Sequence, residues 1–223
     1  MTARMTKTTR VLLLGLTVLS TARARAARAE TPAAADAAAP HGSYQIDPKR
    51  SRFIVETQTS GLSTMFAHDH RIEIRDFSGQ AAFARNQKSG SLQLTVRPKS
   101  MVLIGEDNLG ARQAIESTLR EDVLDTDKFP EITFKTKTVT SSRRGDGTFD
   151  VRLAGELNLH GVKRAITIPA RVSLDGGALH AIGVFEIRQT DYAITPFSFA
   201  NGTVGIKDTV TLSFDIVATQ PKS

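Results

Sequence analysis

The sequence predicts an all-β protein, an antiparallel barrel of eight strands or nearly eight, with one short helix. The main observation is that apolar and polar residues alternate over long stretches, and a period of two is typical of strands with one buried face. Short glycine-containing segments separate these stretches, as turns do. One segment has apolar residues spaced four apart, which is typical of a helix. Long antiparallel strands must bury one face and hide their edges, and a closed barrel does both.

The first 29 residues have the order of a secretory signal peptide. Three basic residues precede an apolar run over residues 11–22, and A-x-A sites follow up to Ala29. The run is too short to cross a bilayer, which takes about 20 apolar residues. We therefore expect cleavage before Glu30 and a periplasmic or otherwise secreted protein, rather than the alternative of an uncleaved amphipathic anchor.

The rest of the chain divides into a linker and one domain. Residues 30–43 are rich in alanine and proline, which predicts a disordered linker. Residues 44–219 are long enough for a single domain with a sizeable core. The sequence contains no second apolar span, so we expect a protein that is not membrane-spanning, with a homodimer as an open alternative to the monomer.

Charge and cysteine content exclude several classes of protein. The chain has 29 Lys and Arg against 23 Asp and Glu, but six of the basic residues lie in the predicted signal, which leaves 23 of each. The basic excess therefore belongs to the signal, and we expect no nucleic-acid partner. The chain has no cysteine, which rules out thiolate zinc sites, a cysteine nucleophile, disulfides and a cysteine-linked lipid anchor.

The individual elements follow from these patterns in chain order. Residues 107–120 are predicted to form the helix, with Asp107 as its N-cap, and to cover a barrel end or edge. The connections are predicted to be turns at residues 88–90, 144–147, 160–161 and 175–177. The clearest alternating stretches are residues 71–75, 92–97, 149–159, 166–174 and 210–216.

Three strings, in the same order, resemble the YceI-like family of lipid- and polyisoprenoid-binding proteins. They are Tyr44–Pro48 followed by Ser51 and Phe53, then residues 119–136 (LREDVLDTDKFPEITFKT), then residues 155–164 (GELNLHGVKR). The resemblance covers nearly all of residues 44–219. The chain departs from many members at residues 66–70, where it has a His-Asp-His string that resembles one branch of the family.

The resemblance implies a lipocalin-like barrel whose interior takes an isoprenoid or fatty chain. The expected function is that of an exported binding protein, without a cofactor and without enzymatic activity, that sequesters or carries an amphiphilic isoprenoid or long-chain lipid ligand. Small inward residues, among them Ala81, Gly155, Ala170 and either Ala181 or its neighbours, would leave volume along the axis, although filled cores also mix small and large side chains. The expected ligand-binding residues are Phe53, Val55, Ile72, Ile74, Phe83, Phe134, Phe149, Val151, Leu153, Leu157, Ile166, Ile168, Ala170, Leu212 and Phe214.

The polar candidates gather around His68 and His70, which share one face if this segment is a strand. They could be structural, contact a ligand headgroup, or supply two ligands to a metal, and the last reading defines the alternative function, a small exported metal-binding or hydrolytic protein. Met65 and Phe66, just before them, are expected at the barrel mouth, and residues 191–199 could lie there too. No serine lies in a G-x-S-x-G elbow and no phosphate or dinucleotide motif occurs, so no catalytic residue and no metal ligand is assigned.

Overall fold

The computed structural model describes residues 40–60, 69–84, 89–145, 147–199 and 203–221. The predicted signal peptide, most of the predicted linker, and Met65, Phe66 and His68 lie outside these ranges. The first strand, β1 (Pro40–Ile46), begins four residues before the predicted start of the domain. Its first residues pair with β4 (Phe77–Ala84), which gives this part of the predicted linker a place in the sheet.

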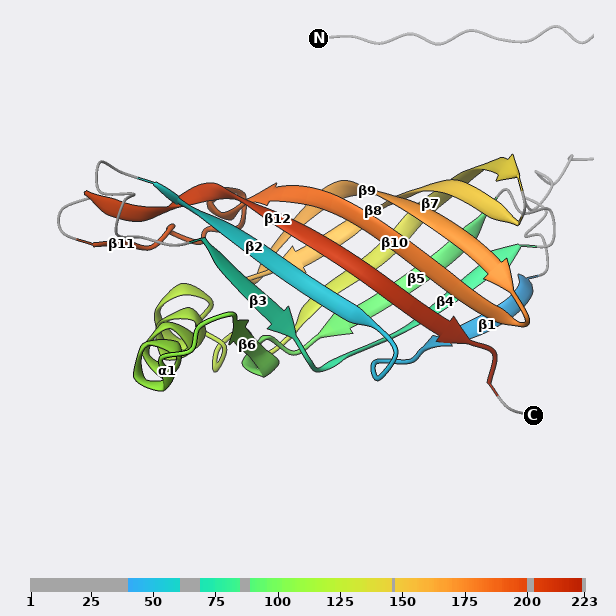
Figure 1. Ribbon diagram of the computed structural model, residues 1–223. Coiled ribbons are helices and arrows are strands. Elements are labelled where there is room, and N and C mark those ends of the chain that lie inside the picture. Colours follow the sequence, from blue (N-terminus) through green and yellow to red (C-terminus); the bar gives the residue numbers. More distant parts are fainter. Residues whose placement is uncertain (1–39, 61–68, 85–88, 146, 200–202, 222–223) are drawn as a thin grey trace, which may run out of the picture. The chain divides into compact units, whose positions relative to one another are not determined.

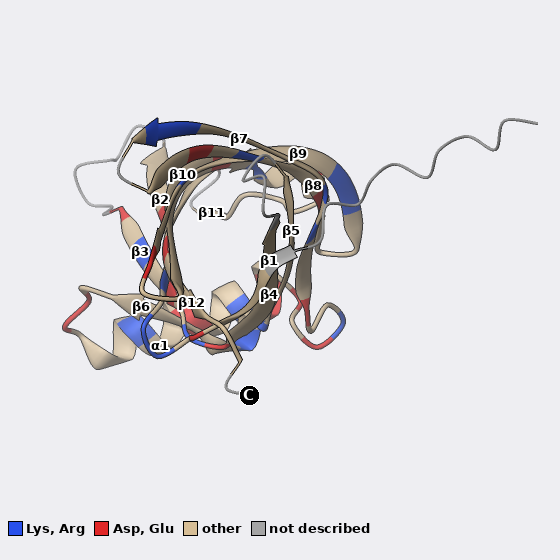
Figure 2. Ribbon diagram, turned by 90° about the vertical axis from the view of Figure 1, so that its right-hand side faces the viewer, with Lys and Arg blue, Asp and Glu red and all other residues tan. Residues whose placement is uncertain are grey.

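The described strands form one antiparallel sheet that closes into an eight-stranded barrel, as predicted (Figures 1 and 2). The barrel closes where Gln45 and Ile46 of β1 pair with Thr219 and Ala218 at the end of the last strand. The strands around the barrel are β1, β4, β5 (Gly90–Val96), β7 (Ile132–Gly145), β8 (Thr148–Leu159), β9 (Val162–Asp175), β10 (Ala178–Arg188) and β12 (Val204–Thr219).

Three further strands extend the sheet beyond breaks in the N-terminal barrel strands β1, β4 and β5. Strand β2 (Arg52–Ser60) pairs with β12 beyond the end of β1, and β3 (His70–Ile74) pairs with β2. Strand β6 (Met101–Ile104) follows β5 after the short turn η2 (Pro98–Ser100) and pairs with β3. Strand β11 (Ser198–Phe199) also pairs with β12, so the sheet has twelve strands although the barrel has eight.

Serine hydroxyls hold these breaks together. At the first break, Ser51 Oγ accepts from the backbone N–H of Val217 at 2.9 Å. At the other two, Ser100 Oγ accepts from the N–H groups of Arg75 and Asp76, at 3.3 and 2.8 Å. Side-chain oxygens thus replace the ladder bonds that the interrupted strands cannot make.

The helix α1 (Leu109–Thr118) follows β6, and a π-helical turn, η3 (Leu119–Val123), extends it. Asn108, one residue after the predicted Asp107, is the N-cap, and its Oδ1 accepts from the N–H of Ala111 at 3.0 Å. The helix is tied to β6, because Glu116 Oε1 accepts from the N–H of Leu103 at 2.9 Å. Strands β6 and β7 do not pair, and the helical segment lies at this open side.

The wall also separates between β9 and β10. Their ladder runs only from Asp175–Ala178 to Arg171–Ile182. The turn at Gly176–Gly177 fixes the register of this hairpin. In that register, Pro169 is the next residue of β9 that should donate its N–H to β10. Proline has no N–H, so the ladder ends there. The turn η4 (Gln189–Tyr192) occupies this end of the wall.

Candidate ligand-binding lumen

Two apolar cavities lie inside the barrel. The turn-end chamber, near the end of β4, the start of β5 and the turn that joins β9 to β10, has a volume of about 100 Å³. The helix-end chamber, near α1, η3 and η4, has a volume of about 130 Å³. For scale, an engineered apolar cavity of roughly 150 Å³ stays dry and binds benzene. Each chamber therefore suits a compact piece of hydrocarbon.

Small side chains create the turn-end chamber. Ala81 on β4, Ala170 on β9 and Ala181 on β10 all line it, as expected for small inward residues. Among the described residues that line it, Ser91 alone is polar. A ligand in such an apolar chamber is stabilised by removal of its own apolar surface from water and is recognised by few hydrogen bonds.

The helix-end chamber has a polar edge. Thr57 and Gln189 line it among otherwise apolar residues. The Gln189 amide is engaged, since Nε2 donates to the carbonyl oxygen of Lys207 at 2.9 Å. The buried Oγ1 of Thr57 has no hydrogen-bond partner within the described structure. A buried hydroxyl group without a hydrogen-bond partner costs about 1–3 kcal/mol. A polar ligand head that bonds to Thr57 Oγ1 would remove this cost, which favours placing the head beside Thr57.

Side chains shared by both chambers form a waist between them. Two of the aromatic ones lie against Phe214, with ring centroids 5.9 Å from Phe214 for Phe53 and 6.4 Å for Phe185. A chain that occupies both chambers must therefore turn these rings aside. The waist consists of Phe53, Leu94, Phe134, Ile168 and Phe185.

Most residues expected to bind the chain line a chamber. The exceptions are Phe149 and Ile166. Phe149 is 2% exposed and its ring packs edge-on against Phe83 at 5.5 Å, so it fills the wall of the core. The expectation omitted Phe185 and the helical residues Leu119 and Val123, although the alternation along residues 179–187 would have placed Phe185 on the inner face.

Gly155 does not add volume to the lumen, which corrects the expectation from its size. A Cβ atom there would lie 2.4 Å from the carbonyl oxygen of Lys135 and 2.9 Å from the ring of Phe134. The glycine makes room for that ring. Gly183 does the same for Phe214, whose ring would lie 2.4 Å from an added Cβ.

Two members of the predicted His-Asp-His string are described: the exposed Asp69, whose Oδ1 accepts from the N–H of Thr59 at 3.0 Å, and His70. His70 is half-buried, begins β3 and lies opposite Thr57 of β2. By alternation it shares the face of Ile72 and Ile74, which line the helix-end chamber. Within the described ranges, no three His, Asp or Glu side chains are grouped to hold a metal. In the same ranges, no helix has the length and apolarity to span a bilayer.

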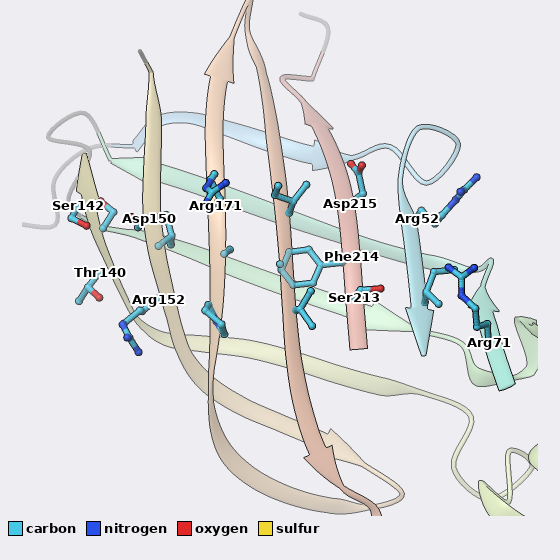
Figure 3. A pocket seen from close by; sticks show the side chains of 18 residues that line it. Arg52, Arg71, Thr140, Ser142, Asp150, Arg152, Arg171, Ser213, Phe214 and Asp215 are labelled. Atoms are coloured by element: carbon cyan, nitrogen blue, oxygen red, sulfur yellow. The ribbon is translucent and has the colours of Figure 1, made fainter. Parts of the chain in front are cut away.

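The outer face of the wall carries a different kind of hollow. It has a volume of about 1100 Å³ and spreads over β2, β3, β7 to β10 and β12 (Figure 3). Arg52, Arg71, Arg152 and Arg171 line it, and Arg71 Nε lies 3.1 Å from Glu56 Oε1. Val151, Ala170 and Phe214 line both this hollow and the turn-end chamber, so the two adjoin where β9 and β10 separate. The outer part of the hollow is open and charged and does not suit an apolar chain.

A carboxylate anchors the turn that closes the separated wall. Asp208 on β12 accepts from the N–H and the Oγ1 of Thr190 in η4, at 2.8 and 2.7 Å, and from Arg188 Nε at 2.9 Å. The hydrogen bonds from Thr190, with the Arg188 charge adding to them, hold the pKa of Asp208 below its ordinary 3.8. Behind the turn, Tyr192 and Ile194 are 2% and 3% exposed.

We expect Asp208→Asn to lower the melting temperature near neutral pH, because the amide loses the charge that these donors stabilise. A lowered carboxyl pKa adds stability above the unfolded-state pKa, and that stability is lost as the pH falls through the folded-state pKa. The gap between parent and variant should therefore shrink below about pH 3.8. Circular dichroism melts across this range measure it, with Asp175→Asn at the exposed end of β9 as the control. A gap that stays constant with pH would contradict the anchoring role.

An antiparallel barrel closed around an apolar lumen defines the architectural class of small barrels that can hold one ligand. The chain belongs to the YceI-like family, whose domain model matches residues 44–218. No curated protein matches the chain.

Three solved structures share the fold at low identity. BcnA from Burkholderia cenocepacia is 20% identical with a TM-score of 0.60, over 78% of this chain and 99% of its own. A polyisoprenoid-binding domain from Saccharophagus degradans, described as implicated in plant cell wall breakdown, is 17% identical with a TM-score of 0.58, over 80% and 98%. A Campylobacter jejuni YceI variant is 17% identical with a TM-score of 0.52, over 68% and 85%.

Proposed function

We propose that this protein is an exported binding protein that sequesters or carries an amphiphilic isoprenoid or other long-chain lipid in its lumen, and that it is not an enzyme. The observation that carries the proposal is the pair of apolar chambers joined at an aromatic waist. Burying an apolar chain contributes about 0.8 kcal/mol per methylene, so a chain that reaches both chambers binds tightly with little polar contact. Thr57 and His70 mark the end at which the polar head would lie.

Two further observations support this reading. The Saccharophagus degradans domain with the same fold is described as polyisoprenoid-binding. Export is supported by the basic, apolar and A-x-A segments in the first 29 residues, so the carrier would act in the periplasm or outside the cell.

Native mass spectrometry of protein purified from the envelope fraction tests both parts at once. We expect a polypeptide mass that begins at Glu30, together with an extra mass that denaturation releases and that organic extraction identifies as a lipid with a long apolar chain. An intact chain from Met1 would contradict export. A protein that carries no lipid, and takes up none when long-chain lipids are added, would contradict the binding function.

A further inference from the structure

A three-stranded ribbon extends the barrel wall at the helix end. Gly205 of β12 pairs with Ser60 of β2 on one side and with Ser198 of β11 (Ser198–Phe199) on the other. The ladder continues beyond β11, because the N–H of Ile206 donates to the carbonyl oxygen of Phe197 at 2.9 Å. Figure 1 shows this ribbon reaching past the ends of β8, β9 and β10.

One face of the ribbon continues the inner face of the barrel. Ile206 lies opposite Thr59, and Thr59 shares a face of β2 with Thr57, which lines the helix-end chamber. Residues directly opposite each other in an antiparallel ladder lie on the same face. Phe197, opposite Ile206, and Phe199, two residues further on, therefore lie on the continuation of the lumen lining.

These phenylalanines lie beyond the part of the barrel where other strands would cover them. Phe197 is 44% exposed and Phe199 is 68% exposed, and Phe199 pairs with the apolar Val204. The neighbouring cation Lys207 is engaged, with its Nζ 2.8 Å from Gln58 Oε1. The exposed end of the lumen lining is thus an apolar strip, and the carboxylate beside it, Asp69, accepts from the N–H of Thr59 at 3.0 Å.

The size and composition of the strip indicate its partner. A stable protein interface buries about 800 Å² on each side, whereas a phenylalanine buries roughly 150–250 Å², so two of them make too small a patch. Shallow insertion into the boundary between headgroups and acyl chains needs only a few such side chains. A bilayer is also where a water-insoluble chain would be collected or delivered.

We propose that the strip formed by Phe197, Phe199, Val204 and Ile206 docks on a lipid bilayer surface and that the ligand chain passes along it between the bilayer and the helix-end chamber. The proposal rests on the proposed lipid-binding function. Contact is made by apolar side chains, so it does not require anionic lipids and it survives high salt.

Sedimentation of the mature protein with phosphatidylcholine vesicles tests the docking. We expect the parent to sediment with the vesicles at low and high salt, and the Phe197→Ser/Phe199→Ser variant to bind them about tenfold more weakly. Val184→Ser is the matched control, since Val184 is 58% exposed but lies on the outer face of β10, and it should bind like the parent. Circular dichroism checks that each variant is folded.

A parent that stays in the supernatant, a double variant that sediments like the parent, or an equal loss in Val184→Ser would overturn the proposal. A second measurement separates it from the proposed function: binding of a long-chain fluorescent fatty acid added from ethanol, without vesicles. We expect the double variant to bind this probe as the parent does. If the parent binds the probe but no vesicles, the docking proposal fails alone. If it binds vesicles but no long-chain lipid, the docking stands, and the proposed function fails together with the passage of the ligand chain along the strip.

Discussion

Replacing Ala170 with phenylalanine is expected to weaken binding of a long-chain fluorescent lipid by about a hundredfold. Ala170 is 8% exposed and lines the turn-end chamber of about 100 Å³. A phenyl ring there takes the space of roughly four methylenes, and at about 0.8 kcal/mol each their exclusion removes some 3 kcal/mol of binding free energy. Fluorescence titration of parent and variant with the same probe measures the loss.

The matched control is Ala165→Phe, because Ala165 lies on the same strand but is exposed, opposite Glu156 on the outer face. It should bind the long probe as the parent does. A short probe that fits the helix-end chamber alone should bind both variants equally. Full affinity of a folded Ala170→Phe protein for the long probe would show that the chain does not enter the turn-end chamber.

Overpacking of this kind costs about 1–3 kcal/mol of stability, so circular dichroism must accompany the titration. If Ala170→Phe does not fold, Ala81→Phe on β4 probes the same chamber from the opposite part of the wall. The ligand proposal then depends on whether that variant loses affinity for the long probe while it keeps the short one.

The sequence alone was sufficient to predict which face of each long strand points into the barrel. Val151, Leu153 and Leu157 line the lumen as the period of two predicted, because successive side chains of a strand must point to opposite faces. The hairpin at His160–Gly161 was also predictable: both residues have a positive φ, and the His-Gly pair marked a turn.

Features that depend on a neighbouring strand could not be read from one segment. The breaks at residues 47–51, 75–76 and 97–100 become meaningful only when Ser51 and Ser100 meet the backbone of other strands. The separation of β9 from β10 needs Pro169 to coincide with a bonding position of the hairpin register. Alternation likewise cannot reveal that the space beside a glycine such as Gly155 is filled by the ring of a residue on the next strand.

Alternation also cannot tell a side chain that lines the lumen from one that fills the wall, and Phe149 is the clearest case. The alternation around Phe149 predicted an inward residue that binds the ligand. In the structure the Phe149 ring is enclosed by protein, is 2% exposed and packs edge-on against Phe83. Phe185 has the same inward direction but lines both chambers and is only half-buried. The two phenylalanines should therefore differ in what they contribute to stability.

We expect Phe149→Ala to reduce the free energy of unfolding by about 3–5 kcal/mol, because it removes a fully packed ring and leaves a cavity that the closed barrel cannot collapse. Phe185→Ala should cost less, since its ring already faces open chamber volume and makes fewer packing contacts there. Urea unfolding at equilibrium measures both, with Ile182→Ala, 39% exposed on the outer face of β10, expected to lie within about 0.5 kcal/mol of the parent. Equal losses for Phe149→Ala and Phe185→Ala would mean that the waist is packed as tightly as the wall, and a lumen of that kind would not admit a chain.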